Sequence, residues 1–241
     1  MTDAPILETI GLEKRFGGVT AIAGIDFRLG AGELRCLIGP NGAGKSTFFT
    51  MLTAQMKPST GRILFQGRDI TALAPHEISR LGIGIKSQVP DVYDSLGVRE
   101  SIWLSARFRH GRARAKAATE AAIERLELGP IAKARVGDLA HGQRQWVEFG
   151  MVIALEPKLI LLDEPTAGMS AEETNRTAEL IREAARHAAV IVVEHDMQFI
   201  RQIAKVVTVF HQGRILAEGS MDAIQANPEV RAVYLGRSGR A

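Results

Sequence analysis

The sequence predicts an α/β fold built around a mostly parallel sheet, and three observations support this class. From residue 159 onward, apolar segments of strand length alternate with helical segments, which is typical of βαβ crossovers. Between Leu34 and Leu52 a short apolar run, a glycine-rich loop and a helical segment follow one another. Between Ile6 and Leu29 short apolar segments are separated by glycines, as in antiparallel strands. We therefore expect a small N-terminal antiparallel β region that precedes a parallel core.

The remaining elements follow in chain order. Gly61–Gly67 predicts a strand that enters a turn, and Gly82–Ile85 predicts a buried strand that ends near Gln88. Alanine-rich and amphipathic spacing then predicts helices up to Leu155, so we expect a helical insertion over approximately 89–155 within one domain spanning 1–241. The last part predicts strands and helices in alternation, at 159–163, 172–186, 190–194, 196–203 and 206–210.

Composition excludes several classes of protein. A chain of 241 residues with 46% hydrophobic and 24% charged residues is ordinary for a folded domain. Its longest apolar runs fall far short of the ~20 residues that a membrane-spanning helix needs. Because Met1–Pro5 also lacks the pattern of a secretory signal, we expect a cytoplasmic location. The net charge of +3 gives no reason to expect a nucleic-acid partner, and the single cysteine, Cys36, is expected in the core.

The glycine-rich loop matches the pattern G-x-x-x-x-G-K-[ST] between a strand and a helix. Glycines let backbone N–H groups close around phosphate oxygens, and the helix N-terminus adds partial positive charge. We expect Lys45 to reach the β- and γ-phosphates of a nucleotide and Ser46 to ligate Mg²⁺. The predicted nucleotide-binding residues of this loop are Gly39, Pro40, Asn41, Gly42, Ala43, Gly44, Lys45, Ser46 and Thr47.

Two carboxylates end the predicted strand at 159–163. Ligands bind at the carboxyl ends of strands in open α/β sheets, so Asp163 is expected to hold Mg²⁺, directly or through water. Glu164 is suited to accept a proton from the water that attacks the γ-phosphate. An acidic pair at a helix start or on a loop surface is the alternative, which the phosphate loop makes less favoured.

Four motifs in order give the chain its family resemblance. They are the phosphate loop, the segment Leu139–Gln143 before a helix, the strand that ends in Asp163-Glu164-Pro165, and His195 after the next apolar strand. The sequence resembles the nucleotide-binding subunit of an ATP-binding cassette (ABC) transporter over nearly its whole length. The cofactors that this resemblance implies are ATP and Mg²⁺.

The resemblance also implies roles for individual residues. Phe16 matches the aromatic residue that stacks on adenine, although core packing is an alternative for it. Gln88 matches a glutamine that contacts Mg²⁺ or water and senses the membrane subunit, and His195 matches a histidine that contacts the γ-phosphate. The implied catalytic residues are thus Glu164, His195, Lys45 and Gln88, and the implied metal ligands are Ser46, Gln88 and Asp163.

The family signature, usually Leu-Ser-Gly-Gly-Gln, contacts the nucleotide held by the opposite subunit. Here it reads Leu139, Ala140, His141, Gly142 and Gln143. Ala140 lacks a serine hydroxyl, which weakens the closed state by about 1.5–3 kcal/mol if nothing replaces the hydrogen bond. Ser170 stands where the family commonly has an aspartate, and it is expected to cap the helix that begins at Ala171.

Further motifs are similar to the ATPases that import branched-chain and other hydrophobic amino acids. They are Arg80–Gly84, Val193–Met197 and the ending Asn227–Gly236, while His141–Trp146 is similar to the urea-import ATPases. A lipopolysaccharide-export ATPase, a non-transport ABC ATPase and a nucleotide switch without turnover are the alternatives. The resemblance implies a second ABC ATPase subunit, transmembrane permease subunits and, indirectly, a solute-binding protein as partners. It places the chain at the cytoplasmic face of the cell membrane, as a peripheral subunit.

Overall fold

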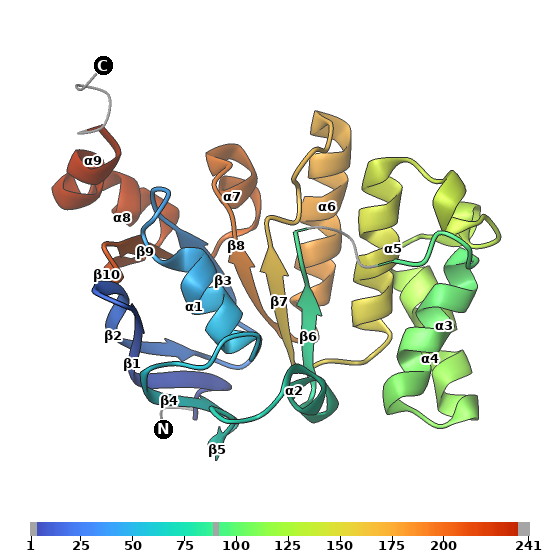
Figure 1. Ribbon diagram of the computed structural model, residues 1–241. Helices are drawn as coiled ribbons and strands as arrows, with labels where there is room; N and C mark the ends of the chain where they lie inside the picture. Colours follow the sequence, from blue (N-terminus) through green and yellow to red (C-terminus); the bar gives the residue numbers. More distant parts are fainter. Residues whose placement is uncertain (1–3, 89–91, 236–241) are drawn as a thin grey trace. The chain divides into compact units, whose positions relative to one another are not determined.

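The computed structural model describes residues 4–88 and 92–235 (Figure 1). The chain divides into two compact units. The first unit comprises Met1–Ile78 and Ala189–Ala241, and the second comprises Ser79–Ala188. The predicted helical insertion lies within the second unit. Helix α2 (Pro75–Leu81) crosses the boundary between the two.

The first unit contains an antiparallel sheet in the strand order β2-β1-β4-β5. Its strands are β1 (Leu7–Phe16), β2 (Val19–Leu29), β4 (Thr60–Phe65) and β5 (Arg68–Asp69). Strands β1 and β2 form a hairpin in which Phe16 pairs with Val19 and Leu7 pairs with Leu29. The predicted antiparallel region is therefore confirmed.

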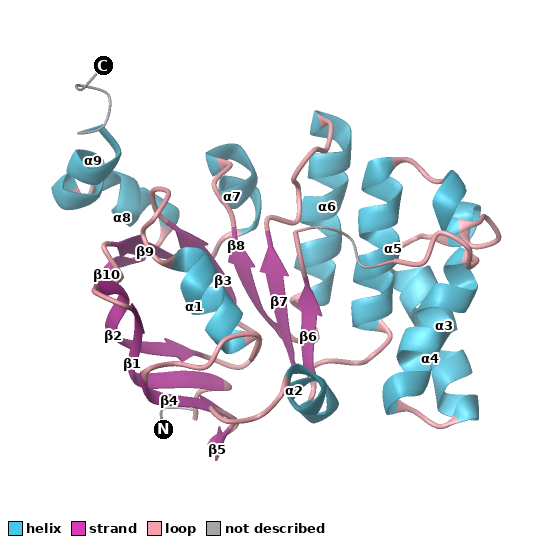
Figure 2. Ribbon diagram, in the orientation of Figure 1, coloured by secondary structure: helices cyan, strands magenta, loops and turns pink. Residues whose placement is uncertain are grey.

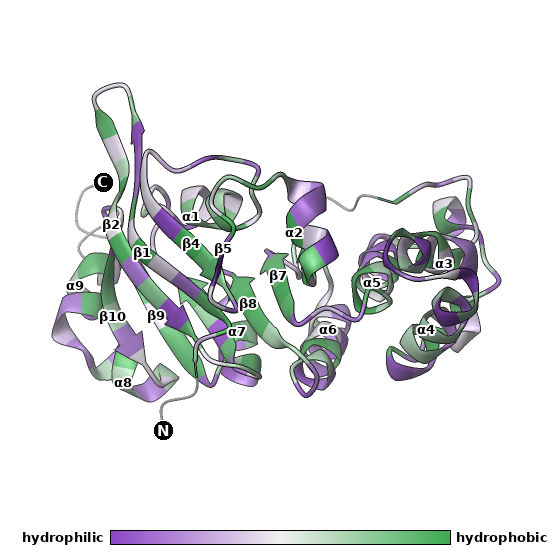
Figure 3. Ribbon diagram, turned by 90° about the horizontal axis from the view of Figure 1, so that it is seen from below, coloured by the Kyte–Doolittle hydropathy of each residue, from purple (hydrophilic) through white to green (hydrophobic). Residues whose placement is uncertain are grey.

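The same unit contains the strand series β10-β9-β3-β8. These are β3 (Leu34–Ile38), β8 (Ala189–Val193), β9 (Val206–His211) and β10 (Arg214–Gly219). Strand β3 pairs in parallel with β8 and with β9, whereas β10 is antiparallel to β9. All five residues of β8 are buried, and Figure 3 shows this strand in hydrophobic colours. Continuous burial is what a parallel strand between two layers requires.

Four further helices lie wholly in the described part of the first unit. They are α1 (Lys45–Leu52), α7 (Met197–Ile203), α8 (Met221–Ala226) and α9 (Pro228–Leu235). Phe48 of α1 packs against Phe27 and Phe210, with ring centroids 5.5 and 5.2 Å away. This aromatic cluster fixes α1 on β2 and β9. Cys36 is fully buried in β3, as predicted.

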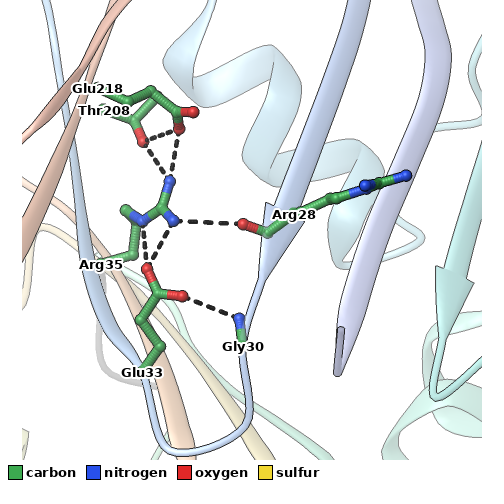
Figure 4. Close-up of polar contacts among 6 residues, drawn as sticks. All are labelled: Arg28, Gly30, Glu33, Arg35, Thr208 and Glu218. Carbon is green, nitrogen blue, oxygen red and sulfur yellow. Dashed lines mark hydrogen bonds and ion pairs between the residues drawn. The ribbon is translucent and has the colours of Figure 1, made fainter. Parts of the chain in front are cut away.

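One charged side chain lies within the otherwise apolar strand β3. Arg35 is only 8% exposed, and its guanidinium donates to Glu33 and Glu218, to the Thr208 hydroxyl and to the Arg28 carbonyl oxygen (Figure 4). Thr208 in turn donates to Glu218 at 2.7 Å. We call these residues the Arg35 cluster. It joins β3 to β9 and β10 through side chains.

The second unit contains the parallel pair β6 (Ile83–Lys86) and β7 (Leu159–Asp163) together with helices. The helical elements are α3 (Val98–Arg109), α4 (Arg112–Arg125), η1 (Gly129–Ile131), η2 (Val136–Asp138), α5 (His141–Ile153) and α6 (Ala171–Ala184). Helices α3, α4 and α5 pack on one another (Figure 2). Gly150 of α5 permits this approach, because an added Cβ there would lie 3.0 Å from Ile102 of α3.

The predicted α/β class is confirmed, and the predicted elements agree with the structure to within two residues at most ends. Sequence patterns did not predict the short elements β5, α2, β10, α8 and α9. Within residues 4–88 and 92–235, every helix is too short or too polar to span a membrane.

Candidate nucleotide site

The phosphate loop between β3 and α1 has a backbone that only glycine allows at two positions. Gly39 has φ 150°, and a Cβ there would lie 2.3 Å from the carbonyl oxygen of Phe210. Gly44 has φ 105°, and a Cβ there would lie 2.8 Å from the Ala21 carbonyl oxygen. The glycine pattern therefore reflects close backbone approach on both sides of the loop. A cradle of this kind can accept phosphate oxygens at its backbone N–H groups.

The Lys45 ammonium binds to the backbone of the first two residues of this loop. Lys45 Nζ donates to the carbonyl oxygens of Gly39 at 2.6 Å and Pro40 at 3.3 Å. Helix α1 starts at Lys45, has no acidic residue in its first turn, and among the described residues no side chain caps it. Its N–H dipoles and the ammonium therefore both favour an anion here. Ser46 is exposed at the same helix end, where its hydroxyl is available to a metal ion.

His195 follows β8, which lies next to β3. Leu37 of β3 pairs in parallel with Val193 of β8, so both strands end at one edge of the sheet. His195 and the phosphate loop thus follow neighbouring strand ends. The His195 ring is 69% exposed, and its Nδ1 lies 3.6 Å from the buried Glu194 carboxylate. Its backbone N–H also donates to Glu194 at 2.8 Å, which fixes the chain at this point.

Phe16 lies at the tip of the β1–β2 hairpin and is 47% exposed. Core packing, the alternative for this residue, is therefore wrong. Lys14 Nζ lies 5.2 Å from the centre of its ring. An exposed ring of this kind is available for stacking on a planar base.

In the second unit, β6 and β7 bring Gln88 and the predicted carboxylates together. Lys86 pairs with Leu162 in the parallel register, so the residues that follow each strand share one edge. Gln88 Nε2 donates to Glu164 Oε2 at 2.7 Å. Glu164 has φ 42°, in the left-handed region that side chains other than glycine seldom adopt. Asp163 is the last residue of β7 and is partly exposed.

The signature segment forms the start of α5. Ala140 is the N-cap residue, and its N–H donates to Gln143 Oε1 at 3.1 Å. Gly142 is buried, and a Cβ there would lie 2.2 Å from the Glu173 carboxylate. Leu139 is held by its carbonyl oxygen, which accepts from Arg144 at 3.2 Å. Ala140 and His141 are exposed at the helix start, so the two unusual residues of the signature face outward.

His141 also contacts the loop that follows Glu164. Its Nε2 lies 3.2 Å from the carbonyl oxygen of Ala167. Ser170 caps α6 as predicted, because its hydroxyl accepts from the Glu173 N–H at 3.3 Å and its own N–H donates to Glu173 at 2.9 Å. The serine thus has a role in the helix start.

Two polar residues near this edge were missed by sequence reasoning. Lys86, in β6, and Gln145, one turn into α5, are buried and in contact. A lysine within an apolar strand is the signal that could have identified them, since such a charge needs partners.

The donor sets fit ATP and Mg²⁺. The phosphate loop supplies backbone N–H donors and the Lys45 ammonium. A side chain in place of Gly39 or Gly44 would clash with neighbouring backbone oxygens. In the described part of the chain no three His, Cys, Asp or Glu side chains cluster as a metal site. A Mg²⁺ ion with one hydroxyl or carboxylate, water and phosphate oxygens needs no such cluster.

Two family models match the sequence. That of the ABC transporter family matches residues 22–167, and that of the branched-chain amino acid ATP-binding cassette transporter matches residues 214–239. A high-affinity branched-chain amino acid transport ATP-binding protein, BraF of Pseudomonas aeruginosa, is 33% identical over 97% of this chain and 99% of its own. LivG of Escherichia coli, described in the same words, is 31% identical with the same coverage.

Other relatives and structures agree on the family. A lipopolysaccharide export system ATP-binding protein, LptB of Acidithiobacillus ferridurans, is 34% identical over 96% of this chain and 97% of its own. An ATP-binding cassette of an ABC transporter in its ADP conformation superposes with a TM-score of 0.84 at 26% identity, covering 96% of this chain and 99% of that one. The cbiO1 protein of Clostridium perfringens gives a TM-score of 0.85 at 27% identity, with 98% of each chain covered.

A model match over more than half of the sequence and relatives that match from end to end lead to one family, and the phosphate loop and the Gln88–Glu164 pair agree with it. The chain belongs to the ABC transporter ATPases, of the branched-chain amino acid type.

Proposed function

We propose that this chain hydrolyses ATP to drive uptake of branched-chain or other hydrophobic amino acids, or of urea, through separate membrane subunits. The observation that carries the hydrolytic part is the Gln88–Glu164 hydrogen bond at the end of β7. It orients the carboxylate that this proposal assigns as the general base. The amino acid part is supported by the match of residues 214–239 and by the names of BraF and LivG. The urea alternative depends only on the similarity of the segment His141–Trp146.

Each residue has a defined task in this proposal. Lys45 and the backbone donors of residues 39–47 bind the phosphates of ATP, and Phe16 stacks on the adenine. Glu164 accepts a proton from the attacking water, while Gln88 and His195 orient that water and the γ-phosphate. Mg²⁺, held by Ser46, Gln88 and Asp163, would neutralise charge on the phosphates.

The proposed active form is a head-to-tail pair of ATPase subunits. The start of α5 is exposed, has no acidic residue in its first turn, and carries Ala140 and His141 outward. Such a helix end suits the γ-phosphate of a nucleotide bound by another subunit. Leu139, Gly142 and Gln143 complete this second contact surface. Closure of the pair on ATP and reopening after hydrolysis would supply the movement for transport.

The segment after Gln88 is the proposed contact with a permease at the cytoplasmic face of the membrane. Tyr93 is 61% exposed and Val92 is partly exposed. Val89 and Pro90, which the sequence also suggested for this contact, lie outside the described residues. A large exposed aromatic ring five positions after Gln88 in the sequence is suited to a helix of a partner protein.

ATP turnover by the purified chain tests the assignment of the base. Glu164→Gln should lower kcat by about 10²- to 10⁴-fold, the usual contribution of a general base. On size-exclusion chromatography with ATP and Mg²⁺ this variant should elute as a dimer, whereas Lys45→Ala should remain a monomer. Glu124→Gln, which changes an exposed glutamate of α4, is the matched control and should behave like the wild type. Equal turnover by wild type and Glu164→Gln would contradict the assignment.

A second candidate function, lipopolysaccharide export, is favoured by the similarity to LptB. Identification of the subunits that copurify with the chain separates the two. A solute-binding protein and an amino acid or urea permease indicate import, whereas lipid-extracting membrane subunits indicate export.

A further inference from the structure

A buried polar cluster lies between strand β6 and helix α5. Its members are Lys86, Gln145 and Glu148, which are 2%, 0% and 5% exposed. We call these three residues the Lys86 cluster. None of them belongs to the phosphate loop, the signature or the carboxylate pair. Lys86 precedes Gln88 by two positions in the sequence, and Gln145 and Glu148 lie in the first turns of α5.

Lys86 fixes the orientation of the Gln145 amide. The ammonium donates to Gln145 Oε1 and to the carbonyl oxygen of Ser87 at 3.3 Å, and it forms an ion pair with Glu148 at 3.3 Å. An ammonium has only donors, so the group it contacts on Gln145 must be the oxygen. The amide NH₂ of Gln145 is therefore directed to the other side.

That NH₂ group faces the backbone of Gln88. Gln145 Nε2 donates to the Gln88 carbonyl oxygen at 3.4 Å, while the Gln88 side chain donates to Glu164 at 2.7 Å. Gln88 is thus held at both ends, by Gln145 through its backbone and by Glu164 through its side chain. A shift of the Gln88 backbone would move the amide away from the carboxylate.

The same NH₂ group also reaches the signature. Gln145 Nε2 lies 3.4 Å from His141 Nε2, and that ring atom lies 3.2 Å from the Ala167 carbonyl oxygen. A neutral histidine cannot satisfy both contacts, since Nε2 accepts from Gln145 in one tautomer and donates to Ala167 in the other. His141 therefore has two alternative partners, one in α5 and one in the loop after Glu164.

Stability alone does not account for a buried lysine. Apolar residues of similar volume replace buried ion pairs with little or no loss of stability, so such a pair is weak support for a purely structural role. Burial lowers the pKa of the Lys86 ammonium, and the Glu148 carboxylate only partly offsets this effect. The hydrogen bond from Lys86 to Gln145 indicates a role other than stability, which is to orient the Gln145 amide.

We propose that Gln145, oriented by Lys86, is a positioning residue that holds Gln88 against Glu164 and links this pair to His141 of the signature. The proposal depends on the proposed function, in which Gln88 and Glu164 act on ATP. Because the signature is proposed to contact the nucleotide of a second subunit, the Lys86 cluster connects the two sites of the pair through side chains of one chain.

A double-mutant cycle on kcat tests the positioning role. Gln145→Met keeps the volume and the charge balance but removes the donor to Gln88. It should lower kcat about fivefold, as the loss of one hydrogen bond predicts, and leave KM for ATP within about twofold. In a Gln88→Ala background, which itself lowers kcat, Gln145→Met should cause no further loss. Equal losses in both backgrounds, or no loss in either, would overturn the proposal.

Two further variants separate positioning from folding. Gln145→Glu still accepts from Lys86 but cannot donate to Gln88, so it should show the same kcat loss even if the methionine variant is unstable. Thr119→Val removes a buried hydroxyl of α4 that donates to the Ala115 carbonyl oxygen at 2.7 Å, and it should leave kcat unchanged.

The link to His141 has a readout that does not depend on turnover. In the full chain with ¹⁵N-labelled histidine, Gln145→Met should shift the ring-nitrogen resonances of His141, and Thr119→Val should not. Unchanged His141 resonances would refute the link. Failure of Glu164 as the base would appear separately, as full turnover by Glu164→Gln, and would leave both the cycle and the resonances readable.

Discussion

Two buried cations, Arg35 in the first unit and Lys86 in the second, occupy strands that are otherwise apolar. Arg35 is bound by two carboxylates, a hydroxyl and a carbonyl oxygen, and all of its contacts lie among strands and their turns (Figure 4). Lys86 has one carboxylate, one amide and one carbonyl oxygen. The amide partner, Gln145, also donates a hydrogen bond to the Gln88 carbonyl oxygen. The first cluster therefore joins strands, whereas the second joins a strand to residues of the proposed catalytic edge.

The chemistry of the two cations differs in a way that matches these roles. A guanidinium stays charged, and its donors, fixed in one plane, bind several acceptors at once, which suits a permanent connection. An ammonium is a point charge whose burial is more costly, and its bonds can rearrange. The difference teaches that burial of a charge is not by itself a sign of function. What decides is whether its partners touch the proposed site.

Lys86→Met should have the largest effect of any single change to the two clusters. It leaves Glu148, whose side chain is 7% exposed, without its cation, and breaking such a pair costs about 3–5 kcal/mol. Chemical denaturation followed by circular dichroism measures this loss. The double variant Lys86→Met with Glu148→Gln should regain most of the stability but keep a lowered kcat. Recovery of both properties together would remove the distinction between the clusters.

Arg35→Met should have a smaller effect, confined to stability. Its partners Glu33 and Glu218 are 21% and 42% exposed at their side chains, so water can solvate them once the guanidinium is gone. We expect a loss of about 2 kcal/mol, comparable to one charged hydrogen bond, and unchanged kcat per folded molecule. Arg35→Lys, which keeps the charge without the planar fork, should fall between the wild type and the methionine variant. A large drop in kcat with normal stability would show that the Arg35 cluster also serves catalysis.

Cys36, an uncharged buried residue of β3, should give the smallest effect and serves as a reference. Burial, with a lesser contribution from Glu194, raises the pKa of this thiol well above its usual 9.0. Above pH 9.0 the unfolded chain loses the thiol proton while the folded chain keeps it, so stability falls as pH rises. The slope approaches about 1.4 kcal/mol per pH unit. Cys36→Ala should remove this part of the slope in denaturation curves measured above pH 9.0, and an unchanged slope would contradict the burial of the thiol.

The sequence predicted best what depends on neighbours along the chain. The start of the strand Leu34–Ile38 and both ends of the strand Leu159–Asp163 were predicted as the structure has them, because each strand is a short apolar run followed by a glycine or an acidic residue. The phosphate loop was predicted for the same reason. The Gln88–Glu164 hydrogen bond joins residues that are 76 positions apart. Only the family resemblance suggested that they act together.

Other features depend on tertiary contacts that no local pattern contains. Gln145 is an ordinary polar residue of a helix in the sequence, and only the packing of α5 on β6 buries it over Lys86. The exposure of Phe16 was also undecided, since an aromatic residue in a β-hairpin can face either way. The short helices α2, α8 and α9 contain too few turns for a clear periodic pattern.

The backbone of Glu164 implies a conflict between two demands on one residue. At φ 42° a residue with a side chain loses about 1 kcal/mol of folding stability to backbone strain, whereas glycine adopts this conformation without strain. Glu164→Gly should therefore relieve backbone strain while it removes the carboxylate bound by Gln88. A search for more stable versions of this chain, made without regard to activity, would favour loss of the proposed base. In the proposed function, ATP turnover requires this carboxylate at a position whose backbone suits glycine.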